Sequence, residues 1–208
     1  MFDIGISTRQ AILNIEAGEP IRSCGGRDFG SNGNGSLMRI LPLAFHIADM
    51  PIDERFQLTK DVSSITHGHI YSVAGCFIYL EITRELILGN SMLEAYEIGA
   101  RTAKDYLDQI GNYDELNGVY DRVFDGLIPS LVDDEISSSG YVVHTLEAAI
   151  WCLLTSSTYK ETVLKAVNLG DDTDTTAAVA GGMAVLVYGV KEIPHSWTRI
   201  LYPMSCTL

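Results

Sequence analysis

The stretch VAGCFIYLEITRELIL, Val73 to Leu88, decides the fold. It is apolar almost all round when it is wound into a helix, and its charged residues lie in its second half, from Glu81 to Glu85. A helix that is hydrophobic on every side is one that other helices enclose. The stretch therefore predicts a central helix in the middle of the core.

Apolar residues recur at helical spacing in further windows on both sides of this stretch. The windows are Ile12 to Ile15, Leu37 to Ile47, Met92 to Leu107, Val142 to Leu154 and Ala177 to Tyr188. Strand signals are weak, because short β-branched runs with period-two alternation are not found between the windows. The pattern predicts an all-α fold. Two segments rich in Gly, Ser, Asn and Asp, Ser23 to Ser36 and Gly111 to Gly140, are expected to form loops or short helices over the bundle.

Length and composition favour a single packed domain over residues 1–208. The net charge of −13 repels nucleic acids and anionic membrane surfaces at long range, so neither is an expected partner. An anionic ligand could still bind locally, through helix N-termini, backbone N–H groups or a divalent cation.

The four cysteines, Cys24, Cys76, Cys152 and Cys206, are widely spaced and form no C-x-x-C pair. This spacing argues against a zinc site and against a disulfide framework, and it fits a reducing cytoplasm. The first ten residues lack the pattern of a secretory signal, and no apolar run is as long as a membrane span. We expect a soluble protein in the cytoplasm.

The motif NLGDDTDTTAAVAGG, Asn168 to Gly182, is the strongest local feature of the sequence. Gly170 ends one helix, and a helix of small residues begins near Asp174. The oxygen donors Asp172, Asp174 and Thr175 then lie together at one helix N-terminus, where they suit a hard divalent cation such as Mg²⁺. Capping of the helix by the same residues is an equally good explanation on spacing alone.

Crowding of the acids favours the metal over simple capping. Asp171, Asp172 and Asp174 repel one another more than a helix cap requires, and a cation would relieve that repulsion. The small residues that follow allow another helix to approach closely.

Three other features could take part in binding. The loop SNGNGS, Ser31 to Ser36, exposes backbone N–H groups that could bind an anion. The alternative is a tight loop in which Ser36 caps the following helix. The loop has neither the ending of a P-loop nor a preceding strand, so it supports neither of those nucleotide-binding motifs. His67 and His69 precede the central helix and could bind a metal, although a capping or core-edge role is the alternative for each. We interpret His69 as structural. Tyr141 stands at the start of a helix, either reaching into a cleft or packed at its rim.

Together these motifs resemble the ADP-ribosylglycohydrolase family in order and spacing. The resemblance rests on FDIGISTRQAI, NGNGSLMRILPLAF, the pair Thr66 and His67, GYVVHTLEAAIW, NLGDDTDTTAAVAGG and YGVKEIPHSW, and it covers nearly the whole chain. It implies an orthogonal multi-helix bundle with a centre of two Mg²⁺ ions, or sometimes Mn²⁺. Such a centre cleaves the glycosidic bond at C1″ of ADP-ribose, so ADP-ribose or an ADP-ribosylated protein is the implied partner.

The resemblance also assigns roles to residues. The metal ligands would be Asp172, Asp174 and Thr175. Asp171 stands where many members of the family have glycine. Contacts to ADP-ribose would come from Ser31, Asn32, Gly33, Asn34, Gly35, His67 and Tyr141.

One departure from the family concerns the N-terminus. In the family, a Thr-Asp-Asp-Thr-like motif well before FDIG provides the opposing metal ligands and the acidic residues near the reacting carbon, whereas here FDIG begins at residue 2. We therefore expect an N-terminally truncated family domain with impaired hydrolysis, whose catalytic acids are not present. The alternative is a non-catalytic ADP-ribose-binding or crystallin-like structural module. Apolar surface exposed by truncation would favour self-association.

Overall fold

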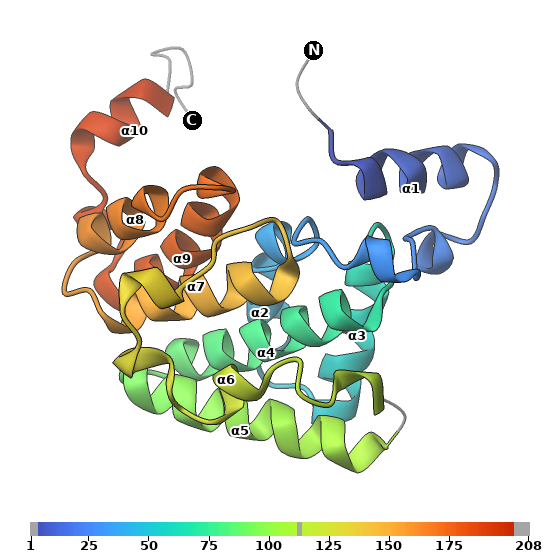
Figure 1. Cartoon of the computed structure of the whole chain (residues 1–208), viewed down its shortest axis with the longest axis horizontal. Helices are drawn as coiled ribbons and strands as arrows, with labels where there is room; N and C mark the ends of the chain where they lie inside the picture. The colour runs from blue at the N-terminus through green and yellow to red at the C-terminus, as the bar shows by residue number, and fades with distance from the viewer. Residues whose placement is uncertain (1–3, 112–113, 202–208) are drawn as a thin grey trace.

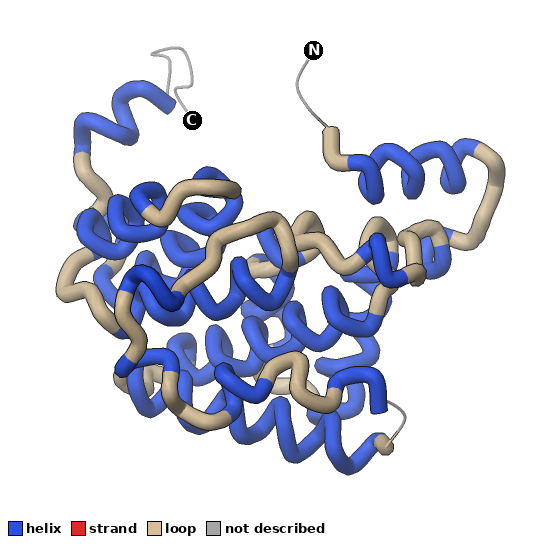
Figure 2. Tube along the Cα trace, in the orientation of Figure 1, coloured by secondary structure: helices blue, strands red, loops and turns tan. Residues whose placement is uncertain are grey.

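The structure is a computed structural model that describes residues 4–111 and 114–201. Phe2 and Asp3 of the FDIG segment and Cys206 lie outside these residues. The described chain consists of helices and loops and contains no strand, only two isolated backbone bridges (Figure 2). The prediction of an all-α fold is confirmed.

Helix α4 (Ile70–Ile87) runs through the middle of the molecule (Figure 1). Fourteen of its eighteen residues are buried, which confirms the predicted central helix. It packs against α3 (Ile52–Ser64), α5 (Met92–Ile110) and α7 (Val142–Leu154). Because α4 is enclosed on several sides, its sequence has no polar face, and the sequence alone does not indicate which face of the helix packs against which neighbour.

Two features fix α4 against its neighbours. At Gly99 of α5 a Cβ atom would lie 2.5 Å from the Cα of Ile82, so only glycine allows the two helices to come this close. On the other side, the guanidinium of Arg55 in α3 donates to both carboxylate oxygens of Glu81, at 2.8 and 2.7 Å. Both side chains are buried, so the pair ties α3 to α4 inside the core.

Helices α8 (Tyr159–Asn168) and α9 (Thr173–Tyr188) pack against each other and against α7. Two glycines of α9 allow close packing, Gly181 against α8 and Gly182 against the residue that precedes α2. A Cβ atom on Gly181 would lie 3.3 Å from Val163 of α8, and one on Gly182 would lie 2.6 Å from Leu41. The small residues after Asp174 therefore allow the close packing that the sequence predicts.

We expected one helix over the window Leu37 to Ile47, but the structure has two short ones. A 3₁₀ turn, η3 (Leu37–Arg39), is followed by α2 (Pro42–Ile47). Pro42 has no backbone N–H to donate to a carbonyl in the preceding turn, so it begins a helix rather than continuing one.

Several helices lie outside the predicted windows. Helix α3 is largely polar, and α8 is too short and too charged to give a strong apolar period. Residues 114–140, the described part of the segment Gly111 to Gly140 apart from Gly111 itself, form short helices and turns over the bundle, as expected. The remaining elements are η1 (Ile21–Ser23), η2 (Phe29–Ser31), η4 (Asp114–Leu116), α6 (Asp121–Phe124), η5 (Ile128–Ser130), η6 (Asp133–Glu135), η7 (Val190–Glu192) and α10 (His195–Leu201).

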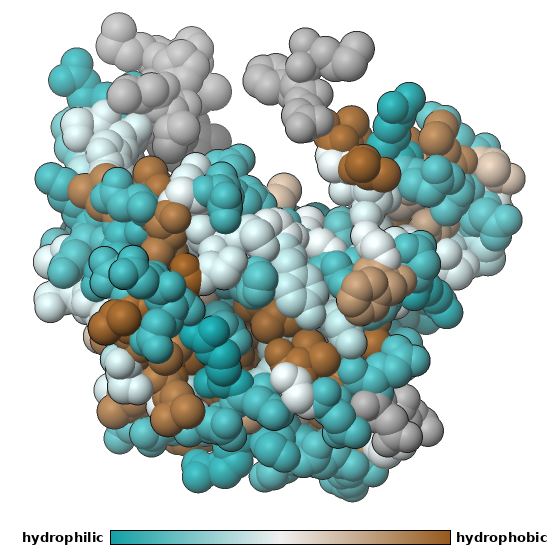
Figure 3. Space-filling model, in the orientation of Figure 1, coloured by the Kyte–Doolittle hydropathy of each residue, from teal (hydrophilic) through white to brown (hydrophobic). Residues whose placement is uncertain are grey.

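Helix α1 (Ile6–Glu16) projects from the body of the molecule (Figure 1). Only Ala11 of this helix is buried, while Ile6 is 89% exposed and Leu13 48% exposed. Figure 3 shows apolar side chains interspersed with polar ones on this projection. Among the described residues, no helix combines the length and hydropathy needed to cross a bilayer.

Candidate functional site

The glycine-asparagine loop, residues 31–35, is held from two sides. Its backbone pairs with the start of α7, since the N–H of Asn34 donates to the carbonyl of Gly140 at 3.0 Å and the N–H of Val142 donates to that of Asn32 at 3.1 Å. On the other side, the hydroxyl of Ser72 in α4 donates to the carbonyl of Gly33 at 3.0 Å. The loop is thus a fixed part of the surface above α4 and α7.

Asn34 connects this loop to the start of α9. Its side-chain amide donates to the Asp172 carboxylate at 2.7 Å and to the Thr145 hydroxyl at 2.8 Å, so both amide protons are used. Asn34 is 8% exposed. A buried amide with two satisfied donors fixes the carboxylate of Asp172 next to the loop.

The start of α9 shows that the Asp172 side chain does not cap the helix. Asp172 occupies the N-cap position, but its carboxylate makes no hydrogen bond to the backbone of the first turn. The carboxylate instead accepts a hydrogen bond from the Asn34 amide, while the backbone N–H of Asp172 donates to the carbonyl of Ser138 at 3.1 Å. The capping explanation therefore does not account for this carboxylate.

The neighbours of Asp172 have different surroundings. Thr175 is buried and its hydroxyl lies 3.9 Å from the sulfur of Met38, whereas Asp174 is exposed. Asp171 has a φ of 51°, the left-handed conformation that glycine adopts most easily. This backbone explains why glycine would fit at that position, and Gly170 before it ends α8 as the sequence predicts.

The donor set at the start of α9 fits a hard cation only in part. Asp172, Asp174 and Thr175 offer three oxygen atoms, while Mg²⁺ takes about six. Within residues 4–111 and 114–201, no three His, Cys, Asp or Glu side chains come together as a metal site. A cation held here would need further oxygens from water, a ligand or another segment.

His67 lies against the glycine-asparagine loop. A Cβ atom on Gly35 would lie 2.6 Å from Cε1 of the imidazole, and one on Gly33 would lie 3.6 Å from its Nε2. On the far side of the ring, Nδ1 is 2.8 Å from the hydroxyl of Thr66. The sequence places His67 only near the central helix, and the structure brings it to the loop.

The protonation of His67 follows from its partners. Arg39 donates to the Thr66 hydroxyl at 2.7 Å, which leaves that hydroxyl to donate to Nδ1 of His67. Burial, with the charge of Arg39, lowers the pKa of His67 to about 4. The imidazole is therefore neutral at pH 7 and carries its proton on Nε2, the atom that faces the loop.

Tyr141 belongs to a row of aromatic rings beside the loop. It forms an isolated antiparallel bridge with Gly33, and its ring lies 6.4 Å from that of Tyr71 and 5.0 Å from that of His144. Phe29, 73% exposed, meets Tyr71 edge-on at 6.1 Å. His69 has the expected structural role, because its Nδ1 accepts the N–H of Tyr71 at the start of α4.

Three residues of the site were not predicted as functional. Thr145, Arg39 and Ser138 act through other residues: they hold Asn34, Thr66 and the backbone of Asp172. Arg39 and Thr145 are ordinary polar residues within predicted helices, and Ser138 is one in a predicted loop. No local pattern distinguishes such residues, because their partners are far away in the sequence.

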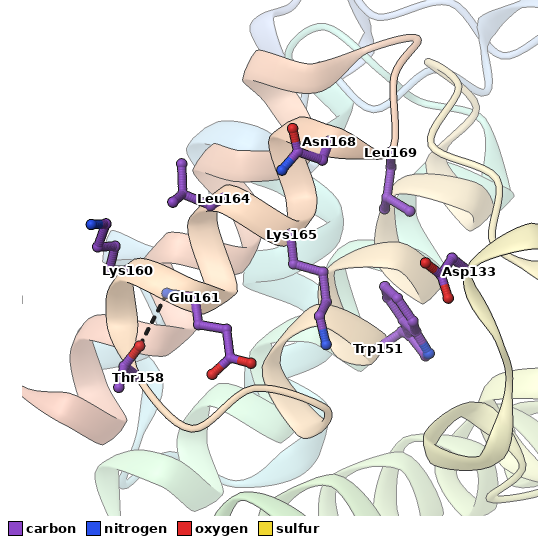
Figure 4. A pocket seen from close by; sticks show the side chains of 9 residues that line it. All are labelled: Asp133, Trp151, Thr158, Lys160, Glu161, Leu164, Lys165, Asn168 and Leu169. Carbon is purple, nitrogen blue, oxygen red and sulfur yellow. Dashed lines mark hydrogen bonds between the residues drawn. The ribbon is translucent and has the colours of Figure 1, made fainter.

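A separate pocket of about 630 Å³ lies beside α8 (Figure 4). Its central polar groups already have partners, since Lys165 donates to the carbonyl of Thr155 at 2.7 Å and lies 4.8 Å from the ring centre of Trp151. Glu161 accepts the N–H of Ser157 at 2.8 Å. These contacts explain the lining as part of the packing of α7 and α8.

The sequence of this chain matches the profile of the family described as ADP-ribosylglycohydrolase over residues 1–206. The chain belongs to the ADP-ribosylglycohydrolase family. Its fold agrees with this membership: a solved structure described as an ADP-ribosylglycohydrolase-related protein complex is similar with a TM-score of 0.75 and 28% identity. That similarity covers 95% of this chain and 64% of the other.

Two relatives within the family indicate which proteins it resembles. The ADP-ribosylarginine hydrolase Tri1 of Pseudomonas putida is 32% identical over 95% of this chain and 49% of its own length. The ADP-ribosyl-[dinitrogen reductase] glycohydrolase of Rhodospirillum rubrum is 31% identical over 81% of this chain and 50% of its own length. The chain thus spans about half the length of the curated relatives it matches.

Proposed function

We propose that this chain forms part of the active site of an ADP-ribosylglycohydrolase, which hydrolyses the bond between C1″ of ADP-ribose and a protein side chain or small molecule. One observation carries the proposal. The amide of Asn34, in the glycine-asparagine loop, binds the carboxylate of Asp172 at the start of α9, 138 residues away in the sequence. This hydrogen bond brings two motifs that resemble those of the family into direct contact, which supports the proposal of a single site.

The start of α9 is the proposed metal-binding side of this site. Asp172, Asp174 and Thr175 would hold Mg²⁺, or Mn²⁺, in a two-metal centre completed by oxygens from elsewhere. When bound, such ions stabilise developing negative charge and orient a water and the sugar. The chain's own contribution is positional: Asn34 fixes one carboxylate oxygen of Asp172, and Ser138 fixes its backbone.

The glycine-asparagine loop is the proposed ADP-ribose side. Backbone N–H groups in a glycine-rich loop bind anions such as a pyrophosphate. Neutral His67 would donate from Nε2 to a ribose hydroxyl or a phosphate oxygen, and Tyr141 would line the cleft beside it. The proposed contact residues are Ser31, Asn32, Gly33, Asn34, Gly35, His67 and Tyr141.

Two further proposals concern the surroundings of the protein. We propose that the chain self-associates through the exposed apolar side of α1, because Ile6 and Leu13 are accessible there. We also propose a cytoplasmic location, supported by Cys24, Cys76 and Cys152, which are free and buried.

Release of ADP-ribose from an ADP-ribosylated arginine peptide in the presence of Mg²⁺ tests the proposed activity. The double change Asp172→Asn and Asp174→Asn should reduce turnover about a hundredfold or more, because loss of even an outer-shell partner of a metal costs about 10- to 100-fold. Asp133→Asn with Asp134→Asn is the control, since it also removes two acidic charges, here from exposed residues of η6. It should leave turnover unchanged.

Two results would overturn the proposal. Equal turnover by the wild type and the Asp172/Asp174 double variant would exclude the metal-binding role. Binding of ADP-ribose by the wild type without any turnover would exclude hydrolysis by this chain alone and would favour the non-catalytic ADP-ribose-binding module.

A further inference from the structure

A five-residue segment, residues 137–141, braces the two sides of the candidate site. The carbonyl of Gly140 accepts the N–H of Asn34 at 3.0 Å, and the carbonyl of Ser138 accepts the N–H of Asp172 at 3.1 Å. The hydroxyl of Ser138 also donates to the carbonyl of Gly170 at 2.9 Å. We refer to residues 137–141 as the brace. Its conformation sets how the glycine-asparagine loop stands relative to the start of α9.

One side chain, His144, holds the brace from within the first turn of α7. Its Nδ1 lies 2.8 Å from the hydroxyl of Ser139 and 3.0 Å from that of Ser137. Its ring meets the Tyr141 ring edge-on, at 5.0 Å between centres and an interplanar angle of 84°. His144 therefore contacts the brace at its beginning, its middle and its end.

The direction of these hydrogen bonds follows from the neighbouring groups. The Ser139 hydroxyl oxygen accepts the N–H of Tyr141 at 3.4 Å, so its own proton is available for His144. Burial, and then the charge of Arg122, lower the pKa of His144 below its ordinary value. With the ring proton on Nε2, the one lone pair of Nδ1 is shared between the Ser139 hydroxyl at 2.8 Å and the Ser137 hydroxyl at 3.0 Å.

We propose that His144 is a positioning residue: by accepting from Ser137 and Ser139 it fixes the brace, and through the brace it sets the placement of Asn34 and Asp172. Within the described residues, its hydrogen bonds go to Ser137 and Ser139 rather than to Asn34 or Asp172. The positional part of this inference is independent of the reaction, whereas its consequence for ligand binding rests on the proposed function.

Amide hydrogen exchange measured by NMR on the full chain tests the positional part. His144→Phe keeps a ring but removes the acceptor, so exchange of the Asn34 and Asp172 amides should accelerate about tenfold. His144→Asn places an amide oxygen near the position of Nδ1 and should restore most of the protection. His46→Phe, at an exposed position of α2, is the control for introducing a phenylalanine and should change neither amide.

The double variant Ser137→Ala with Ser139→Ala removes the same two contacts from the side of the brace. It should accelerate amide exchange at Asn34 and Asp172 as His144→Phe does, with a melting temperature close to that of the wild type. If His144→Phe fails to fold, this double variant tests the role of the two hydrogen bonds in its place. Unchanged exchange at both amides in the serine double variant would overturn the proposal. Equal exchange in His144→Phe and His144→Asn would also overturn it, because the acceptor would then be irrelevant.

Calorimetric titration with ADP-ribose tests the consequence for binding. We expect Kd for ADP-ribose to rise about tenfold in His144→Phe and to change less in His144→Asn. If the wild type binds no ADP-ribose, the proposed function fails while the exchange experiment still decides the role of His144. An unchanged Kd in a His144→Phe variant with accelerated exchange would show that the brace does not position the ligand site.

Discussion

At the scale of single residues, Gly35 has no room for a side chain. A methyl group there would lie 2.6 Å from Cε1 of His67, so Gly35→Ala must displace the imidazole or the loop. We expect Kd for ADP-ribose to rise about tenfold, since one lost oriented donor is worth roughly 1.5 kcal/mol. Gly5→Ala, just before α1, is the control, because its methyl group would meet no atom within 4 Å. Equal affinities of the two variants would contradict the placement of His67.

His67 should also make stability depend on pH. Its pKa in the folded chain is about 4, below the ordinary 6.5, so the unfolded chain binds the proton more readily. The stabilisation is therefore complete above pH 6.5 and is lost as the pH falls from 6.5 towards 4, by about 3 kcal/mol in total.

Urea unfolding across this pH range checks the prediction for His67. His67→Asn retains an acceptor for Thr66 but does not titrate, so its free energy of unfolding should fall less steeply between pH 6.5 and 4. His46→Asn, at an exposed site, should follow the wild type. Parallel curves for the wild type and His67→Asn would contradict a buried, neutral imidazole.

At the scale of elements, the buried ion pair between α3 and α4 should be costly to break. Glu81→Ala leaves the guanidinium of Arg55 charged and buried. The guanidinium keeps its hydrogen bond to the carbonyl of Met50 but loses both bonds to the carboxylate. Such losses cost about 3–5 kcal/mol. Asp108→Ala breaks the exposed pair with Lys104 on α5 and should have little effect on the free energy of unfolding. Similar urea midpoints for the two variants would contradict the burial of the pair.

The helices differ in how well the sequence predicts them. The window Val142 to Leu154 coincides with α7, because this helix has a strong apolar face and begins directly after a loop. Phe56 is the one large apolar side chain that α3 buries, and its other buried residues are Arg55, Thr59 and two serines, so hydrophobic periodicity does not reveal this helix. The apolar spacing continues through Pro42, but Pro42 has no backbone N–H to donate to the preceding turn. The single helix predicted here is therefore two helices in the structure.

At the scale of the whole molecule, α1 offers an apolar face that the rest of the described chain does not cover. We expect the purified chain to sediment as a mixture whose average mass rises with concentration. Leu13→Lys should shift it towards monomer, whereas Gln10→Lys, exposed on the same helix, should not. A monomer at high concentration for the wild type would contradict self-association through α1.

The candidate site was predictable in its parts but not in its assembly. Asp172 and the glycine-asparagine loop are each visible as local motifs, and the family resemblance places them in one site. The Asn34 amide that joins them, the Thr66 and Arg39 contacts behind His67, and the brace depend on residues far apart in sequence. A single sequence without known relatives contains no local signal for such pairings.

The central claim is that the glycine-asparagine loop and the start of α9 form one ADP-ribose site. Calorimetric titration of ADP-ribose in the presence of Mg²⁺ tests it most directly. We predict that two variants bind ADP-ribose more weakly than the wild type: the double variant Asp172→Asn with Asp174→Asn, and the single variant Gly35→Ala. The double variant Asp133→Asn with Asp134→Asn should bind ADP-ribose as the wild type does. Binding that responds to neither the loop variant nor the α9 variant would contradict the claim.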